Sequence, residues 1–191
     1  MKKMISLFAV LLFTVSAYAQ KTLISDGAHS RIQFTVTHLG INDITGSFDK
    51  AELTINADEK SFVKSTLNFS ADINSINTHI EARDNHLKSA DFFDAAKYPK
   101  MEFTSTSLVN SKNKNEYTLK GNLTLHGVTK PVSLQLLYRG STVNPMNKKE
   151  THAYQVLGTL KKSDFGVGAN FPEAVISDLV NIKGDFELTE K

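Results

Sequence analysis

Apolar and polar residues alternate along most of the chain after residue 30, and this period of two predicts half-buried β-strands. Ile32, Phe34 and Val36, for example, are separated by polar neighbours. Runs of this kind occur near residues 31–37, 48–55, 63–73, 101–103, 117–125, 132–138, 152–161 and 182–188. About eight strands suffice for an up-and-down barrel that encloses one ligand. The pattern predicts an all-β fold, an eight-stranded antiparallel β-barrel, with a β-bulge near Asp49 and Lys50 where the apolar phase changes.

Residues 75–97 depart from the alternation and show helical spacing instead. Their apolar positions are Ile76, Ile80 and Leu87, and a neighbouring cationic stripe contains His79, Arg83 and His86. We expect Asp91 to cap a second short helix, which carries Phe92 and Phe93 and ends before Pro99. The segment is predicted to be a small helical insertion that covers the mouth or the flank of the barrel.

The first 19 residues have the features of a secretory signal peptide. Lys2 and Lys3 form a basic start, residues 5–15 an apolar run, and Ala17-Tyr18-Ala19 a small-residue cleavage site. The apolar run is too short for a convincing transmembrane helix. We therefore expect residues 20–191 to form one exported domain with no integral membrane segment after processing.

Removal of that segment would leave the chain electrically balanced. The full chain has 22 Lys and Arg and 20 Asp and Glu residues, and loss of Lys2 and Lys3 makes the two totals equal. This balance gives no reason to expect a nucleic acid or an electrostatic membrane anchor as partner. The chain contains no Cys, which excludes disulfides, thiol chemistry and a lipid-anchored cysteine. A second copy of the chain, in a homodimer, stays open as a partner.

Catalytic signatures are scarce. His79 and His86 have no acid at ligand spacing and no H-E-x-x-H pair occurs, so no metal site is predicted. The sequence has no G-x-S-x-G motif, and Asp164-Phe165-Gly166 spells a kinase motif whose other elements are absent, so we expect a turn there. Arg83 and Asp84 are interpreted as a surface ion pair or a structural clamp rather than as an acid–base pair. We therefore expect neither catalysis nor a cofactor.

The apolar positions of the strands are expected first of all to pack as a core, but the small residues among them favour a cavity inside the barrel. Ser65, Ala71, Ser105, Gly121 and Gly184 lie in this phase, where a filled core would carry larger branched side chains. Small inward positions would leave room for a ligand. The residues predicted to line this room are Phe34, Val36, Leu67, Phe69, Phe103, Gly121, Leu123 and Leu125.

Several short motifs follow one another in a characteristic order through nearly the whole of residues 20–191. They include His38-Leu39-Gly40, Gly46-Ser47-Phe48, Arg83-Asp84, Asp91-Phe92-Phe93-Asp94, Tyr98-Pro99, GNLTLHGVT at 121–129 and Asp164-Phe165-Gly166. In these motifs and their spacing the sequence resembles the YceI-like family of bacterial periplasmic proteins. Leu23 is a departure, because the family often carries an aromatic residue near that position.

The resemblance implies a lipocalin-like barrel that holds an amphiphile along its interior, with a function in periplasmic binding, transport or storage rather than catalysis. Ligands of the family include isoprenoid pyrophosphates, quinones and fatty amides, so a polyisoprenoid or another long-chain lipid is the expected partner. From charge and helical spacing we infer that Arg83, His86 and Lys88 meet a polar head group. The alternative for Arg83 is that, with Asp84, it only fixes the insertion to the barrel.

Two other classes remain open at this point. A small outer-membrane β-barrel also combines a signal peptide with an even number of alternating strands, and alternation alone does not say which phase faces inward. The absence of Trp and the presence of only five Tyr residues argue against the aromatic girdles of such a barrel. A hydrolase that acts on a lipid-like substrate, with a metal or an acid–base pair, is the second alternative.

Overall fold

The computed structural model describes residues 20–191, so the signal peptide predicted at residues 1–19 lies outside the described residues. The strands are β1 (Gln20–Ser25), β2 (Arg31–His38), β3 (Asn42–Phe48), β4 (Ala51–Asp58), β5 (Thr66–Asp72), β6 (Ile76–Asn77), β7 (Lys100–Asn110), β8 (Glu116–Leu125), β9 (Val128–Val143), β10 (Glu150–Lys161) and β11 (Leu179–Glu190). Within these residues there is one α-helix, α1 (Glu81–Lys88), and three short 3-10 helices at Phe62–Lys64, Ile73–Ser75 and Lys162–Phe165.

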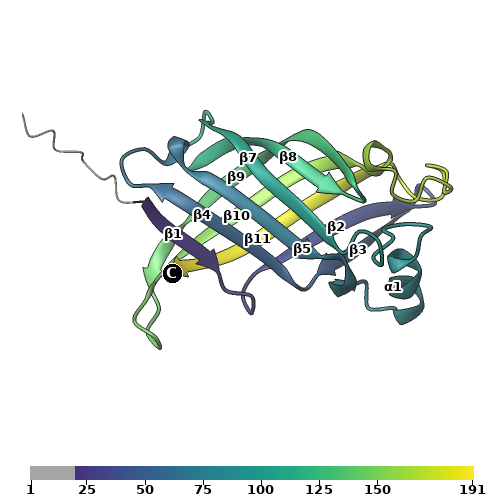
Figure 1. Cartoon of the computed structure of the whole chain (residues 1–191), viewed down its shortest axis with the longest axis horizontal. Coiled ribbons are helices and arrows are strands. Elements are labelled where there is room, and N and C mark those ends of the chain that lie inside the picture. Colours follow the sequence, from purple (N-terminus) through teal and green to yellow (C-terminus); the bar gives the residue numbers. More distant parts are fainter. Residues whose placement is uncertain (1–19) are drawn as a thin grey trace, which may run out of the picture.

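The strands form one antiparallel barrel (Figure 1). Each strand in the order β1-β4-β5-β7-β8-β9-β10-β11 is hydrogen-bonded to the next, and β11 pairs back to β1 through Leu188, Thr189 and Glu190. Closure of this kind leaves no open edge along the eight strands. The predicted eight-stranded barrel with a small helical insertion is confirmed. The described residues hold three further strands, β2, β3 and β6, which extend the sheet from β11.

One strand changes its partner along its length. β11 pairs with β2 through Asn181–Asp185 and with β1 near its C-terminal end. Between these two stretches the backbone N–H of Glu187 donates to Ser30 Oγ at 3.3 Å, and its carbonyl accepts from Asp26 N–H at 2.8 Å. The wall beside β11 is therefore β1 at one end of the barrel and β2 at the other, where the helical insertion lies (Figure 1).

The apolar phase of the strands faces the barrel interior. Ile55, Leu67, Leu136 and Leu188 are fully buried there, with no exposed surface. The alternate positions point outward and are polar, as in β7 and β8, where the exposed residues include Glu102, Thr104, Lys120 and Asn122. This orientation is opposite to that of an outer-membrane barrel, whose apolar phase faces lipid.

Two local predictions were wrong. Asp49 and Lys50 form no bulge but a corner between β3 and β4, which do not pair with each other. Ser75 accepts hydrogen bonds from both backbone N–H groups. Asp49 N–H donates to the Ser75 carbonyl at 3.1 Å, and Lys50 N–H donates to the Ser75 hydroxyl at 3.0 Å. Bulges occur instead between Ser105 and Ser107 and between Ala153 and Tyr154. Phase alone could not separate a bulge from a change of sheet partner.

No second helix begins at Asp91. Residues 90–97 are turns whose backbone returns to the end of α1: Phe93 N–H donates to Leu87 O at 3.0 Å and Ala95 N–H to Lys88 O at 2.9 Å. The segment thus satisfies the last carbonyls of α1, which a helix leaves without partners inside itself. The Asp91 carboxylate contacts the His86 ring rather than a helix N-terminus.

Candidate functional site

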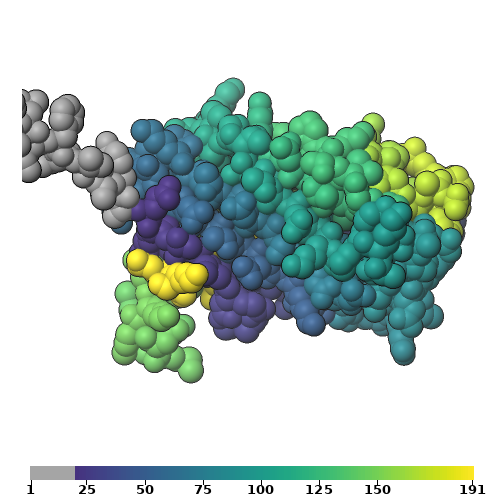
Figure 2. Space-filling view, in the orientation of Figure 1, coloured from purple at the N-terminus to yellow at the C-terminus, as the bar shows by residue number. Residues whose placement is uncertain are grey.

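An apolar cavity of about 410 Å³ lies inside the end of the barrel that carries the insertion. Its wall is built from inward positions of β2, β3, β7, β8, β10 and β11, among them Phe34, Val36, Ile44, Met101, Leu125 and Ile182. Its roof comes from α1 with the turns after it and from the segment 162–178, which lie together at one end of the molecule (Figure 2). A volume of this size lies within the range of small-molecule sites.

Polar groups of the cavity are concentrated where the roof meets the wall: His38, Thr78, Arg83, His86, Lys161 and Lys162. Thr78 is buried and Arg83 half-buried. Arg83 Nε donates to the Thr78 hydroxyl at 2.7 Å and Nη2 to the Thr78 carbonyl at 2.8 Å. The Asp84 carboxylate accepts from Thr78 N–H at 2.8 Å and from its hydroxyl at 2.5 Å. Arg83 and Asp84 therefore clamp the start of the insertion through one threonine.

His86 lies at the rim and takes part in an aromatic cluster. Its Nε2 is 3.2 Å from a carboxylate oxygen of Asp91, and its ring meets Phe92 and Phe171 edge-on, at 5.0 and 5.7 Å between centroids. Phe92 and Phe171 stack at 4.6 Å with 18° between their planes. Because Phe92 follows α1 and Phe171 belongs to the segment 162–178, this stack joins the two halves of the roof.

The segment 162–178 is held at both of its ends. Lys162 Nζ donates to the carbonyls of Gly168 and Phe171, both at 3.3 Å. The Asp178 carboxylate accepts from the backbone N–H and the hydroxyl of Ser163, both at 2.9 Å. These two hydrogen bonds, the backbone one first, and the nearby Lys162 keep the pKa of Asp178 below its ordinary value. The lysine ammonium and the carboxylate thus act as internal ties of the roof.

The residues proposed from the sequence divide into three groups. Phe34, Val36 and Leu125 line the cavity, as do Arg83 and His86 at its rim. Leu67, Phe69, Phe103, Gly121 and Leu123 lie deeper in the barrel and are packed against one another or against the core. Lys88, at the end of α1, is not among the lining residues. Contact of any of these residues with a ligand stays a prediction.

The small inward residues do not create the cavity, contrary to the sequence argument. Ser65 Oγ accepts from Asp58 N–H at 3.0 Å and Ser105 Oγ from Leu67 N–H at 2.8 Å, so both hydroxyls satisfy strand backbone. Gly121 is covered by the Phe103 ring, and Gly184 by the Phe186 ring. These positions are small because a neighbouring residue fills the space beside them.

Sequence reasoning missed the roof residues of the segment 162–178. Phe165, Val167, Phe171, Val175 and Ile176 all line the cavity. The segment had been interpreted only as a turn, and its 3-10 helix does end at Gly166, whose φ of 69° is the left-handed conformation that glycine adopts easily. The available signal was the density of apolar residues in a stretch that has neither strand nor helix periodicity.

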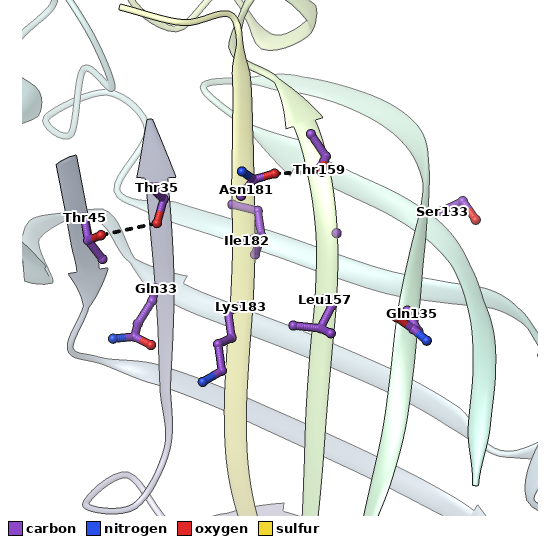
Figure 3. Close-up of a pocket in the computed structure, with 11 residues that line it drawn as sticks. Gln33, Thr35, Thr45, Ser133, Gln135, Leu157, Thr159, Asn181, Ile182 and Lys183 are labelled. Carbon is purple, nitrogen blue, oxygen red and sulfur yellow. Dashed lines mark hydrogen bonds between the residues drawn. The ribbon is translucent and has the colours of Figure 1, made fainter. Parts of the chain in front are cut away.

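A second hollow, about 600 Å³, lies on the outer face of the sheet and has a different character. Figure 3 shows hydroxyl and amide side chains from β2, β3, β9, β10 and β11 along it, including Thr35, Thr45, Thr159 and Asn181. Several of these side chains bind one another, Thr35 to Thr45 at 3.3 Å and Thr159 to Asn181 at 2.9 Å. The hollow is open to solvent, and none of its lining residues is a His, Asp or Glu.

Neither a cluster of metal ligands nor a membrane-spanning helix occurs among residues 20–191. No three His, Asp or Glu side chains in this part of the chain converge to hold a metal ion. No helix in the same range has the length and apolar composition needed to cross a membrane.

The fold and the site define a small antiparallel barrel with an apolar cavity at one end. A family model described as the YceI-like domain matches residues 24–188, and the chain belongs to this family. The resemblance noted in the sequence is therefore confirmed.

Relatives are similar to this protein in sequence or in structure over most of the chain. Protein YceI of Salmonella agona is 36% identical over 162 residues, which are 84% of this chain and 83% of that protein. The crystal structure of BcnA from Burkholderia cenocepacia superposes with a TM-score of 0.76 at 21% identity, covering 85% of this chain and 98% of BcnA. A domain from Saccharophagus degradans, described as a polyisoprenoid binding domain implicated in plant cell wall breakdown, gives 0.67 at 18% identity, covering 91% and 100%.

Proposed function

We propose that this protein binds a long-chain amphiphile, a polyisoprenoid, an isoprenoid quinone or a fatty amide, in the apolar cavity of its barrel. The observation that carries the proposal is the distribution of polarity in the cavity. Its wall is aliphatic and aromatic, whereas its basic side chains, Arg83, His86, Lys161 and Lys162, lie where the wall meets the roof. Such a site suits a ligand with an apolar tail inside and a polar head at the rim.

Most of the affinity would come from the tail. Burial of one methylene contributes about 0.8 kcal/mol, so one isoprene unit contributes roughly 3–4 kcal/mol before ordering costs. An exposed cation near an anionic head contributes about 1 kcal/mol or less, and salt reduces it further. The cavity would therefore select its ligand mainly by the size and shape of the tail, and only modestly by the head group.

The relatives support the class of ligand. The Saccharophagus degradans domain, which shares the fold, is described as polyisoprenoid binding. The family relationship extends over residues 24–188 and so includes the whole cavity. The proposal keeps polyisoprenoid, isoprenoid quinone and fatty amide as alternatives within this class of ligand.

A binding role is favoured over catalysis because several polar side chains at the cavity already have structural partners. Arg83 is engaged with Thr78, and Lys162 with the carbonyls of the roof. No lining Ser stands beside a lining His in the way that nucleophilic catalysis requires. The proposed place of action is the periplasm, as a carrier or a store, which rests on the signal-peptide features of residues 1–19.

The test is the lipid that co-purifies with the protein from the periplasm, identified by mass spectrometry, and its loss in a cavity variant. Val36→Asp places a carboxylate among apolar lining residues and should remove most of the bound lipid. Thr35→Asp is the matched control, because its side chain lies next along β2 but on the outer face (Figure 3). A folded Val36→Asp protein that co-purifies with as much lipid as the wild-type protein would contradict the proposal.

A further inference from the structure

The turn between β2 and β3 carries apolar side chains where a hairpin turn usually carries polar ones. It consists of Leu39, Gly40 and Ile41, which we call the tip. Leu39 is 55% exposed and Ile41 is 86% exposed. Turns favour Gly, Asn, Asp, Pro and Ser, because these residues accept the backbone conformations of a turn or bind its backbone groups. The tip departs from this rule at two of its three positions.

The backbone of the tip adds a cost of its own. Leu39 has a φ of 52°, in the left-handed region that bulky side chains seldom adopt and that Asn and Gly adopt readily. More than half of the Leu39 surface is exposed, so packing offsets little of this strain. Folding alone would therefore favour Asn or Gly at this position. An exposed leucine in a strained conformation points to a function outside the fold.

The tip belongs to the rim of the cavity. Leu39 N–H donates to the Val175 carbonyl at 3.0 Å, and His38 forms a β-bridge with Ile176. His38, Val175 and Ile176 all line the cavity. Whatever the tip binds is therefore brought next to the cavity, at the end of the barrel that carries the roof.

Leu179, at the start of β11, adds a third exposed apolar side chain near the tip. It is 52% exposed, and its carbonyl accepts from the Ser177 hydroxyl at 2.8 Å. The same hydroxyl accepts from Thr37 N–H at 2.9 Å, which ties Leu179 to β2 two residues before the tip. The exposed Lys161 lies directly opposite Leu179 on β10. Aliphatic side chains next to a lysine are typical of surfaces that lie at a membrane interface.

These features fit a lipid bilayer better than another protein. A stable protein interface takes about 20–30 residues from each partner, whereas the tip and Leu179 present three large apolar side chains. Nothing lies within 4 Å of a methyl group placed on Gly40, so the tip projects into open space. A projecting turn can insert its aliphatic side chains into a bilayer without a partner surface of matching shape.

We propose that the tip and Leu179 dock the cavity rim on the surface of a phospholipid membrane. The proposed function concerns the ligand, whereas this inference concerns the surface from which the ligand is taken or to which it is delivered. Its purpose rests on the proposed function, because transfer at a docked rim keeps an apolar tail out of water. The docking itself needs no ligand in the cavity and is measured separately.

The attraction to the membrane should be apolar rather than electrostatic. Lys161 is exposed beside Leu179, but the exposed Asp43 lies on β3 next to the tip and accepts from the Thr37 hydroxyl at 2.9 Å. The two charges offset each other, so anionic lipid should add little. Binding to vesicles of phosphatidylcholine should therefore be comparable to binding to vesicles that also contain phosphatidylglycerol, and added salt should not release the protein.

The test is co-sedimentation of the purified protein with these two kinds of vesicle. The double variant Leu39→Asn with Ile41→Ser removes the apolar side chains of the tip and should weaken vesicle binding at least about tenfold. Asn accepts the left-handed conformation of position 39, so the variant should fold at least as stably as the wild-type protein. Wild-type protein that sediments with neither kind of vesicle would overturn the docking proposal.

A matched control lies at the far end of the barrel. Val143 and Met146, in and beside the connection from β9 to β10, are 60% and 92% exposed. The double variant Val143→Ser with Met146→Ser removes a similar amount of exposed apolar surface and should leave vesicle binding unchanged. Equal weakening by the two double variants would show general surface hydrophobicity instead of a docking site at the tip, and the proposal would be wrong.

The remaining outcomes separate docking from lipid binding and from self-association. The tip variant should lose vesicle binding and still co-purify with lipid, whereas Val36→Asp should lose lipid and still bind vesicles. If the wild-type protein sediments as a dimer without vesicles, and the tip variant as a monomer, the tip binds a second copy and membrane docking is wrong. If lipid is absent from the wild-type protein but vesicle binding depends on the tip, the proposed function fails and the docking surface stands.

Discussion

Arg83 holds Thr78 through two hydrogen bonds, at 2.7 Å to its hydroxyl and 2.8 Å to its carbonyl. Thr78 directly follows β6, and Arg83 is the third residue of α1. The contact therefore ties the helix to the strand from which the insertion departs. The same guanidinium borders the cavity, so one side chain has both a structural contact and a place at the mouth.

Arg83→Gln is expected to lower stability by about 2 kcal/mol, because Thr78 is buried and would lose charge-assisted hydrogen bonds. Thermal and urea unfolding would measure this loss. Anionic and neutral lipids of equal tail length should then weaken alike. Lys88→Gln, on the same helix but outside the cavity lining, serves as the control. An unchanged unfolding curve together with a selective loss of anionic lipid would instead favour a head-group role for Arg83.

His86→Gln should affect the head group rather than the fold. The ring is about half exposed and lies at the rim, so its loss should have a small effect on stability. One lost hydrogen bond corresponds to about 1 kcal/mol, or roughly a fivefold weaker affinity for an amphiphile with an anionic head. Affinity for a neutral lipid of the same tail should change less. Equal weakening of both lipids would remove His86 from the head-group site.

Phe171→Ala should speed ligand exchange, because it removes the ring that joins the two halves of the roof. A stacked pair contributes about 1 kcal/mol beyond its buried area, which corresponds to roughly fivefold faster dissociation. Stopped-flow displacement of a fluorescent lipid would measure the rate. Phe62→Ala breaks a comparable stack at the far end of the barrel and is the matched control. If both variants released ligand at the wild-type rate, the stack would not gate the cavity.

Asp178 should make the roof sensitive to acid. Its hydrogen bonds with Ser163 lower its pKa in the folded state. The corresponding stabilisation is present above the unfolded value, about 3.9, and is lost as pH falls through the lower folded value. The difference in melting temperature between the wild-type protein and Asp178→Asn should therefore be constant from about pH 5 to 7 and shrink below about pH 4. Asp164→Asn, which removes only an exposed pair with Lys130, should show little difference at any pH.

Gly121→Ala should destabilise the barrel rather than simply reduce the cavity. An added methyl group would collide with the Phe103 ring and with the Thr104 carbonyl, which belongs to the neighbouring backbone. Overpacking of this kind costs about 1–3 kcal/mol. Gly27→Ala is the control, because nothing lies within 4 Å of a methyl group at that position. Equal unfolding midpoints for the two variants would show that the Phe103 ring moves aside freely.

The barrel could be predicted because its signal is local. A period of two, as in Ile32, Phe34 and Val36, follows directly from the geometry of a strand, and the break at residues 75–97 follows from helical spacing. The motifs of the family added the class of fold. Local pattern could not distinguish a bulge from a corner at Asp49, because both change the phase of the apolar residues. Only the strand pairing decides between them.

The cavity was only partly predictable. Phe34, Val36 and Leu125 were identified from the apolar phase, but the same phase also selected Leu67, Phe103 and Leu123, which are buried in the barrel and do not line the cavity. Alternation says which residues point inward and carries no information about depth along the barrel axis. The roof residues near Phe171 were missed because their role depends on a contact with Phe92, almost eighty positions earlier.

The sequence by itself determined most of the strands, the inserted helix and the family, because these depend on short-range periodicity and on ordered motifs, but β1, which closes the barrel, was not among the predicted strands. The tertiary structure alone decided where the interior is empty. Gly121 and Gly184 suggested open space, yet the rings of Phe103 and Phe186 occupy it. Whether a small residue leaves a hole depends on which large side chain the register brings beside it, and the register is fixed only when the barrel closes.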